Sequence, residues 1–377
     1  MPQFINGPVN FVQLVGNINN IQKNITIFMD VHLDLNNQTR CESFDSIDIS
    51  YYLYNQIKTT KISLDFFLEI RDEQLQHQIT NKRDIYIKDV IEMFKSEFII
   101  EKDKVKYSKS NSNVRLHYLD IRDHLNIFYI GNQINNITIP TLNSLKNDVL
   151  TDNILTDNDK INILEQIKTN INKIKQHTDN IFENMNNIQQ NSNYSFDKKS
   201  QKYYLNKMIH KYEHTTLKTK INYFCDKNII KYMIDIKGII LQIIKTLFYY
   251  KNDLKNIEYI NEILLLVDSL NSIILKMYTF FTDIYFLRRF LDKDYIQNVI
   301  TYCGRYHALN YIFFLVKYCK FKINKIYNTN GLSIDNIVNK IIETNDLNDI
   351  YNLFLVKGEK PKQCIVDIPI EEIMLID

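Results

Sequence analysis

The first third of the chain alternates short apolar runs with segments whose apolar residues recur at helical spacing. Four runs predict buried strands, at residues 11–15, 25–29, 62–70 and 114–121. Two segments between them predict amphipathic helices, at 46–57 and 86–98, the first with Ser46 or Asp45 as its N-cap. A strand–helix–strand order favours parallel strands joined by right-handed crossovers.

The pattern changes between about residue 142 and residue 291. Apolar residues recur three and four positions apart, and four or five helices are predicted there, at 154–188, 203–221, 229–250 and 257–290. The polar stretch 186–200 is predicted as a loop. Strand character returns at 299–303, and a helix follows at 308–318.

These patterns predict an α/β fold, a mostly parallel sheet flanked by helices, interrupted by a long all-helical insertion. Residues 1–140 form the N-terminal half of the α/β domain and 141–291 the insertion. Residues 292–377 complete the first domain and add a tail of short helices. At 377 residues the chain is long enough for such an arrangement.

Composition limits the classes of function. The 46 basic and 44 acidic residues leave a net charge of +2, which argues against a general nucleic-acid binder. The skew toward Asn, Ile, Lys and Tyr is typical of an AT-rich genome, such as that of a large DNA virus or a protist parasite. The N-terminus lacks the basic and apolar regions of a signal peptide. We therefore expect a cytoplasmic protein, in the host cytoplasm or the virion if it is viral.

The five cysteines are widely spaced and include no C-x-x-C pair, so we expect reduced thiols and neither a zinc knuckle nor a disulfide framework. The most apolar window, 263–287, is interrupted by Asp268, Lys276 and Asp283. A membrane span needs about 20 mostly apolar residues with few charges. A buried helix and a soluble protein are the interpretation we favour.

Two histidines follow predicted strands at opposite ends of the chain. His32 comes soon after the run 25–29, and His307 follows the strand 299–303. Asp30 shares a strand face with His32, and Gly304 lies where a sharp turn favours glycine. In open α/β sheets, ligands collect at the carboxyl ends of strands. Imidazole and carboxylate are natural metal ligands, so the pattern predicts a metal or acid–base site.

These residues resemble the two G-x-x-H motifs of the superfamily that groups TraB, TIKI-type proteases, ChaN-like haem-binding proteins and erythromycin esterases. Each motif follows a strand, one near the start of the domain and one near its end. Gly304-Arg-Tyr-His307 matches the second motif, and Met29-Asp-Val-His32 occupies the place of the first, with Met instead of Gly. The matching residues lie within 25–70 and 285–316.

The resemblance implies a divalent metal ion and a hydrolytic or haem-binding role. An acidic residue ending the second strand of the family is matched by Glu69, and an arginine before the last strand by Arg288 or Arg289. The implied site has His32 and His307 as metal ligands, and Asp30, Glu69, Arg289 and Arg288 as catalytic groups. A metal-bound water is then the nucleophile, and a carboxylate accepts its proton.

Two other patterns of polar residues are candidates for a functional site. Asp120 and Arg122 alternate onto one strand face, which predicts a strand-end ion pair or a second shell of polar groups around the site. Asp30-Val-His32-Leu-Asp34 also resembles the D-x-H-x-D signature of ureohydrolases such as arginase. Its S-x-D companion at Ser46-Ile-Asp48 falls on a predicted helix instead of a later strand, which disfavours that interpretation.

We therefore expect a metal-dependent hydrolase of the protease or esterase type, acting on a peptide or ester. The alternative is a catalytically inactive binding or structural protein, viral or host-interacting, that retains the fold. Met29 in place of Gly and the viral type of composition favour this alternative. A nucleic-acid-associated factor would need a basic face assembled from the lysine-rich insertion.

Overall fold

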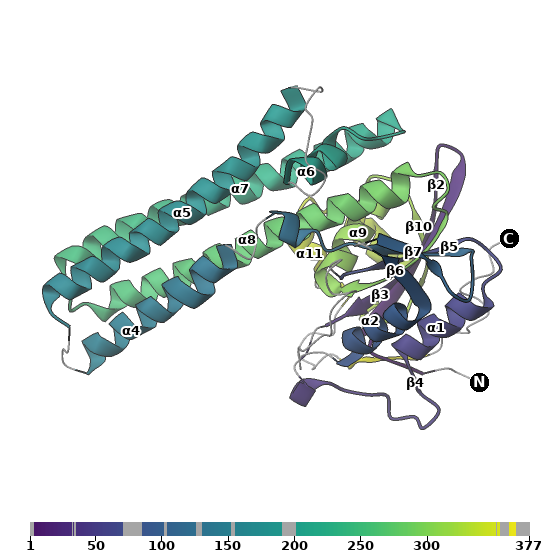
Figure 1. The fold of residues 1–377 in the computed structure, drawn as a ribbon, viewed down its shortest axis with the longest axis horizontal. Helices are drawn as coiled ribbons and strands as arrows, with labels where there is room; N and C mark the ends of the chain where they lie inside the picture. Colours follow the sequence, from purple (N-terminus) through teal and green to yellow (C-terminus); the bar gives the residue numbers. More distant parts are fainter. Residues whose placement is uncertain are drawn as a thin grey trace. The chain divides into compact units, whose positions relative to one another are not determined.

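The structure is a computed structural model that describes residues 4–31, 33, 35–70, 85–101, 104–125, 130–151, 155–190, 201–351, 353–354 and 362–366. Its contacts divide the chain into two compact units, residues 1–120 with 285–377 and residues 121–284. The first unit is α/β and the second is helical, which confirms the predicted fold class (Figure 1). The helical unit spans residues 121–284, whereas the sequence predicted a helical insertion at residues 141–291.

A six-stranded sheet with the order β10-β2-β3-β9-β5-β8 forms the centre of the α/β unit. Its strands are β2 (Asn10–Ile18), β3 (Ile21–Asp30), β5 (Leu64–Leu68), β8 (Val114–Tyr118), β9 (Asn298–Gly304) and β10 (Lys322–Ile326). β3, β9, β5 and β8 run parallel, as the strand–helix order predicts, whereas β2 is antiparallel to β3 and β10 is antiparallel to β2. β9, from the far end of the chain, lies between β3 and β5.

β2 and β3 form a hairpin that the apolar runs alone did not predict. β2 and β3 pair along their full length, and Asn19 and Asn20 join them with φ of 49° and 67°. Two successive residues with positive φ are typical of a type I′ turn, for which Asn is favoured. Smaller sheets join β1 (Ile5–Asn6) to β4 (Ile47–Asp48) and β11 (Cys364–Ile365), and β6 (Phe98–Glu101) to β7 (Lys104–Ser108).

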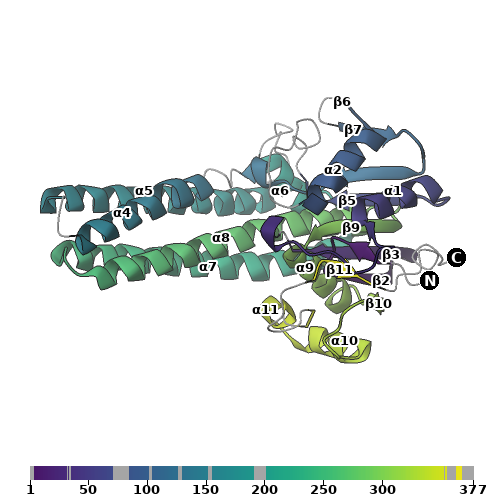
Figure 2. The ribbon, with the colours of Figure 1, turned by 90° about the horizontal axis from the view of Figure 1, so that it is seen from below.

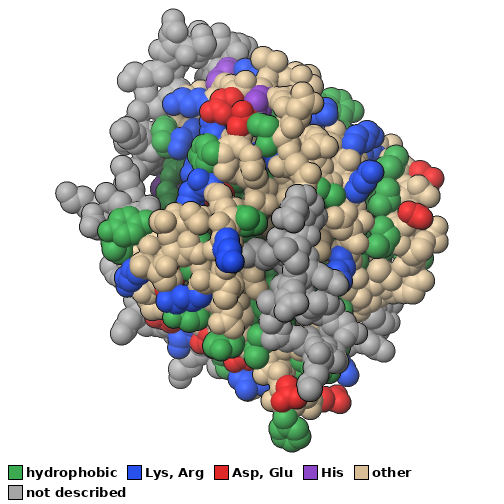
Figure 3. Space-filling model, turned by 90° about the vertical axis from the view of Figure 1, so that its right-hand side faces the viewer, with side chains coloured by type: hydrophobic (Ala, Val, Ile, Leu, Met, Phe, Trp, Pro, Cys, Tyr) green, Lys and Arg blue, Asp and Glu red, His purple; other side chains and the backbone are tan. Residues whose placement is uncertain are grey.

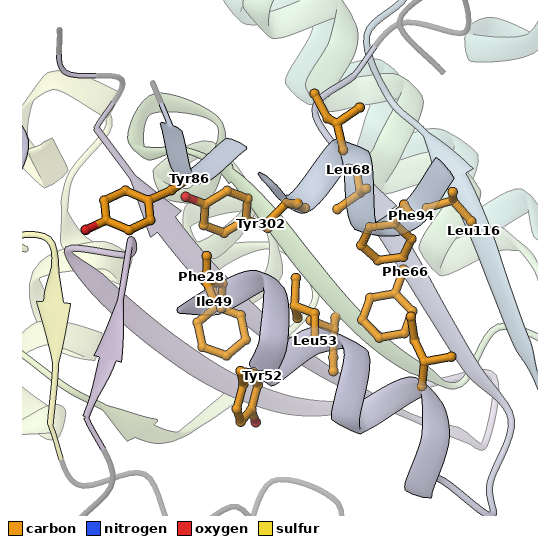
Figure 4. Packing of buried hydrophobic residues seen from close by; sticks show 14 of the residues in the cluster. Phe28, Ile49, Tyr52, Leu53, Phe66, Leu68, Tyr86, Phe94, Leu116 and Tyr302 are labelled. Atoms are coloured by element: carbon orange, nitrogen blue, oxygen red, sulfur yellow. The ribbon is translucent and has the colours of Figure 1, made fainter. Parts of the chain in front are cut away.

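One face of the sheet is covered by α1 (Ile49–Thr59) and α2 (Ile85–Glu97) (Figure 4). Phe28 on β3 contacts Tyr52 on α1, and Phe66 on β5 contacts Phe94 on α2, with ring centroids 5.6 and 5.2 Å apart. Alternate strand residues supply this apolar layer, as the two-residue period of a strand requires. The N-cap of α1 is Asp48, so the predicted cap at Ser46 or Asp45 is wrong.

The other face packs against α9 (Arg305–Lys317) and the end of α8 (Ile257–Asp292). Phe67 on β5 contacts Phe286 on α8, with ring centroids 5.1 Å apart. From His307 to Val316 every residue of α9 is buried, which explains why this helix is apolar on all sides. The chain continues through α10 (Ile334–Glu343) and α11 (Leu347–Tyr351).

The helical unit consists of long rods that run side by side (Figure 2). Its elements are η3 (Arg122–Leu125), η4 (Asn132–Thr138), α4 (Ile139–Leu150), α5 (Asp157–Gln190), α6 (Gln201–Ile209), α7 (Thr215–Asn252) and most of α8. The predicted helix 203–221 is interrupted at residues 210–214. Its second half continues into the predicted helix 229–250 as α7, a helix of 38 residues, because buried Phe224 and Cys225 maintain the helical period through the polar gap. The predicted loop 186–200 begins inside α5, and its residues 191–200 lie outside the described residues.

Among the described residues, one helix is long and apolar enough to cross a membrane by length and composition alone, and it is α8. Core helices of soluble proteins pass the same test. The last third of α8 is almost completely buried, with Phe281, Phe286 and Leu291 no more than 1% exposed. On the face drawn in Figure 3, lysines and arginines are interspersed with acidic and apolar side chains.

Candidate functional site

Three neighbouring parallel strands bring their carboxyl ends to one edge of the sheet. Asp30 ends β3 and lies in register with Gly304, which ends β9. Glu69 directly follows β5, whose Leu68 lies in register with Tyr302 on β9. His307 lies in the first turn of α9, three residues after Gly304. The strand edge predicted to hold polar side chains therefore assembles Asp30, Glu69 and His307 from distant parts of the sequence.

Glu69 and His307 form a nearly buried pair. Nε2 of His307 lies 3.0 Å from Oε1 of Glu69, and the two side chains are 5% and 9% exposed. The backbone N–H of Gly304 donates to the second carboxylate oxygen, Oε2, at 2.7 Å. Because Gly304 is the N-cap of α9, the carboxylate also faces the positive end of the helix dipole. One carboxylate thus connects β5, the end of β9 and the first turn of α9.

Gly304 does not need the conformational freedom of glycine at this turn. Its φ and ψ are −58° and 145°, an extended conformation that any residue adopts. The predicted strained turn is therefore wrong at this position. The backbone N–H of Gly304 donates to the carboxylate of Glu69, a contact that a residue with a side chain could also make.

Asp30 is covered by the C-terminal segment of the chain. Its Oδ1 accepts the backbone N–H of Val31 at 2.7 Å and Nε2 of Gln363 at 3.3 Å. Gln363 is completely buried, and its backbone N–H donates to the hydroxyl of Thr39 at 2.7 Å. A buried carboxylate is costly unless it accepts hydrogen bonds, so Gln363 contributes to the stability of this strand end.

A disulfide holds that segment in place. Cys41 and Cys364 are bonded at a sequence separation of 323, with their Cα atoms 5.0 Å apart. The expectation of reduced thiols throughout is therefore wrong for this pair, because the fold brings together cysteines whose spacing carries no disulfide signal. Cys225, Cys303 and Cys319 are free and buried.

The second histidine of the predicted metal site, His32, lies outside the described residues, as does Asp34 of the arginase-like pattern. Ser46 and Asp48 of that pattern both accept from the amide of Asn6. In the part of the chain that the structure describes, no three His, Cys, Asp or Glu side chains are placed to hold a metal ion. Oε2 of Glu69 accepts the backbone N–H of Gly304, and Oε1 lies 3.0 Å from Nε2 of His307. The described residues thus do not form a metal shell.

A second polar cluster lies on the same face of the sheet and joins β5 to β8. Nε and Nη2 of Arg115 donate to the two carboxylate oxygens of Asp65, at 2.7 and 2.6 Å. Nε2 of His117 lies 2.7 Å from Oδ1 of the same carboxylate. Asp65 is in register with Arg115, so the pair is a direct cross-strand contact. Its bidentate geometry is the strongest form of an arginine–carboxylate contact.

The pKa values of Asp65 and His117 in this cluster both lie below their ordinary values. Burial by itself raises the pKa of Asp65, but hydrogen bonds from Arg115 and His117 outweigh burial and hold that pKa below its ordinary value. Burial lowers the pKa of His117; the hydrogen bond to Asp65 opposes this effect, and the charge of Arg289 adds to it. The cluster therefore contains an ionised carboxylate and a neutral imidazole at neutral pH.

The two arginines matched to the family have partners elsewhere. Arg289 donates to Nδ1 of His117 from Nε and Nη2, at 3.3 and 3.1 Å. Arg288 lies 3.9 Å from Asp292 on the same helix. Asp120 is buried, and its backbone N–H donates to Ile70 at 3.1 Å, whereas the side chain of Arg122 lies outside the described residues. The structure thus brings Arg289 to the β5–β8 cluster.

Sequence reasoning missed Asp65 as the centre of this cluster. The sequence does show an acidic residue, Asp65, inside the apolar run 62–70, and a basic residue, Arg115, inside the apolar run 114–121. A buried charge inside a strand needs a partner on the neighbouring strand. Without the register, that partner could not be identified.

Aromatic rings connect the two polar clusters. The ring of Phe67 stacks on His117 at 4.5 Å and contacts Phe286 at 5.1 Å, and Phe286 contacts Tyr311 at 4.1 Å. Tyr311 in turn lies 6.3 Å from the ring of His307. The polar groups are therefore held in an apolar, close-packed layer, where hydrogen bonds are stronger than in water.

Comparison with known proteins gives relatives without an assigned function. The model of a family described as a family of unknown function (DUF5847) matches residues 3–368. Two uncharacterised proteins of Acanthamoeba polyphaga mimivirus are 28% and 31% identical to the chain, over 94% and 93% of its length and 93% and 94% of their own. A third from the same virus is 29% identical over 85% of the chain and 87% of its own length. No solved structure matches. The viral source of these relatives agrees with the viral interpretation of the composition.

Proposed function

The chain belongs to the family of unknown function DUF5847, and from its strand-end geometry we propose that it is a hydrolase of peptides or esters with the TraB/TIKI/ChaN-like fold. The observation that carries the proposal is the buried contact of 3.0 Å between Glu69 and His307 at the carboxyl ends of parallel strands. A carboxylate that orients an imidazole is the usual arrangement of a histidine general base.

The pair has a defined chemical task in this proposal. When Nε2 of His307 carries the ring proton, it donates to Glu69, and Nδ1 is the ring atom that accepts a proton. A water deprotonated by His307 attacks the acyl carbon, and the imidazolium returns that proton to the leaving alcohol or amine as the acyl bond breaks. Glu69 stabilises the imidazolium between these steps.

A metal-dependent form of this activity was expected from the resemblance. A divalent metal would lower the pKa of a bound water. The described residues alone do not form the shell for such an ion, so no step of the proposed reaction passes through a metal. His32 and Asp30 are the residues that a metal-dependent form would have to recruit.

A second candidate is a binding or structural protein that retains the fold. The observation that favours it is the hydrogen bond of 2.7 Å from Gly304 to Glu69. Through this contact the Glu69 carboxylate stabilises the junction of β9 and α9, a structural role that requires no catalytic activity.

One experiment separates the two candidates. The purified full chain is assayed with chromogenic esters and a peptide library, first with a chelator and then with Zn²⁺ or Mn²⁺, and its metal content is measured before and after His32→Ala. For a hydrolase, Glu69→Gln and His307→Gln lower turnover by about 10²–10⁴-fold, and His214→Gln, on the helical unit, leaves turnover unchanged.

The opposite result supports the binding protein. Wild-type protein then shows no turnover above buffer with any substrate or metal, and Glu69→Gln lowers only the thermal midpoint. Turnover that Glu69→Gln and His307→Gln leave intact would also contradict the proposed roles of these residues.

A further inference from the structure

Helix α7 carries a line of exposed apolar side chains along its length. The line consists of Tyr223, Ile230, Ile234, Leu241 and Phe248, which are between 47% and 66% exposed. Their spacings of seven, four, seven and seven residues keep all five within about 20° of one direction on an α-helix. The line is roughly 37 Å long at the rise of an α-helix. Exposed apolar groups scattered singly are ordinary, but five of them aligned along one side of a helix indicate an interaction surface.

This line is separate from the face that α7 packs into the helical unit. The buried residues of α7 include Phe224, Ile236 and Ile243, and the ring of Phe224 lies 4.9 Å from that of Phe280 on α8. A core-facing helix needs only one apolar stripe. The second stripe of α7 is therefore not explained by the fold of the unit.

The exposed charges of α7 are almost all positive. Five exposed lysines lie on the helix, Lys227, Lys231, Lys237, Lys245 and Lys251, against one exposed acid, Asp226. Two of them contact acids on α5, since Lys237 lies 3.6 Å from Asp179 and Lys251 lies 3.3 Å from Glu165. On α8 the exposed charges include Glu258, Glu262 and Asp268. α7 is thus the basic surface of this helix pair.

We propose that α7 binds the surface of an anionic phospholipid bilayer. The helix lies along the membrane, with its five apolar side chains at the boundary between headgroups and acyl chains. Its lysines extend their ammonium groups to lipid phosphates while their carbon chains lie along apolar surface. This inference is independent of the hydrolase proposal, because it concerns only the helical unit.

The same residues fit other partners less well. A coiled-coil dimer of two copies would need apolar side chains alternately three and four positions apart along α7. Lys227 and Lys237 occupy two of those positions. Such pairing also brings two basic surfaces together. A nucleic acid would neutralise the lysines, but it would leave Ile234, Leu241 and Phe248 unused.

Vesicle flotation of the full chain tests the proposal. Vesicles of phosphatidylcholine with phosphatidylserine are compared with phosphatidylcholine alone, at low and high salt. The protein is expected to float with the anionic vesicles, and to float less with the neutral ones or in high salt. Lys227→Gln and Lys245→Gln are each expected to weaken partition about fivefold, the effect of one lysine near such a surface.

Apolar variants provide the sharper comparison. Leu241→Ser and Phe248→Ser are expected to weaken partition by about 10²-fold or more together. Leu265→Ser is the matched control, because Leu265 is 69% exposed on α8 and lies outside the line. All three changes are on exposed positions, and thermal midpoints within a few degrees of wild type show that folding is retained.

Three outcomes would overturn the proposal. The first is equal recovery with and without anionic vesicles, or an equal loss for Leu265→Ser. The second is a dimer in solution that Leu241→Ser dissociates, without binding to vesicles. The third is salt-dependent retention on DNA or RNA that the lysine variants abolish and Leu241→Ser does not, again without binding to vesicles.

Discussion

Arg289 donates hydrogen bonds to Nδ1 of His117 from the end of α8, at 3.1 and 3.3 Å. This contact requires the neutral imidazole to accept at Nδ1 and to donate from Nε2, which faces Asp65 at 2.7 Å. A guanidinium, an imidazole and a carboxylate thus form one ordered chain across two strands and a helix. Its members stabilise the packing of α8 against the sheet.

Asp65→Asn is expected to lower the free energy of unfolding by about 2–4 kcal/mol, because it removes a buried charge partner from Arg115 and His117. The Arg115 side chain is 37% exposed, so partial solvation limits the loss. Urea unfolding of the full chain measures it. The control is Asp268→Asn, an exposed position on α8, where a change within about 0.5 kcal/mol is expected. Equal effects of the two variants would contradict this role of Asp65.

Stability is expected to fall as pH drops below about 6.5, the ordinary pKa of histidine. Burial lowers the pKa of His117 in the folded protein, so between that lower pKa and 6.5 the unfolded chain binds more protons. Stability therefore rises with pH in this window, by at most about 1.4 kcal/mol per pH unit for one group. Burial also lowers the pKa of His177, which adds to the slope.

Urea unfolding between pH 5 and 8 measures this slope. His117→Gln retains an amide that can donate to Asp65 and removes the titrating ring, so it is expected to flatten the slope. His177→Gln is expected to remove the second contribution independently. An unchanged slope in His117→Gln would show that His117 binds protons equally in the folded and unfolded states.

Removal of the disulfide is expected to destabilise the α/β unit. Cys41→Ser and Cys364→Ser each free a long loop, and the expected loss is about 2–5 kcal/mol. Thiol titration in denaturant is expected to find the three free cysteines in the oxidised protein and all five after reduction. Cys319→Ser, which leaves the bond intact, is the comparison. Five reactive thiols without reduction would show that the bond does not form.

Gly16→Ala is expected to cost about 1–3 kcal/mol, because a Cβ at this position of β2 would lie 2.3–2.6 Å from the Phe321 ring. Gly238→Ala on α7 is the matched control, since a Cβ there meets nothing within 4 Å. That substitution is expected to stabilise the helix by about 0.5–1 kcal/mol. Thermal or urea unfolding measures both. A neutral Gly16→Ala would mean that the Phe321 ring moves aside.

Much of the fold follows from local pattern. The apolar runs that became β5, β8 and β9, and the helical spacing of α1, α2, α5 and α8, lie close to their predicted positions. Burial on one or both faces imposes these periods on the sequence. The ends of elements were less predictable. α7 continued through a polar gap, and α1 began at Ile49 because Asp48 is its N-cap.

The site divides in the same way. Local pattern alone predicts that Asp30 and Glu69 end apolar runs and that His307 lies a few residues beyond the end of another, because apolar runs stop at the edge of a buried sheet. The tertiary fold set the strand order: β9 lies between β3 and β5, which brings Glu69 to His307, and β8 pairs with β5, which brings Arg115 to Asp65. Only it joined Cys41 to Cys364. Strand order and register depend on long-range packing, which local periodicity does not encode.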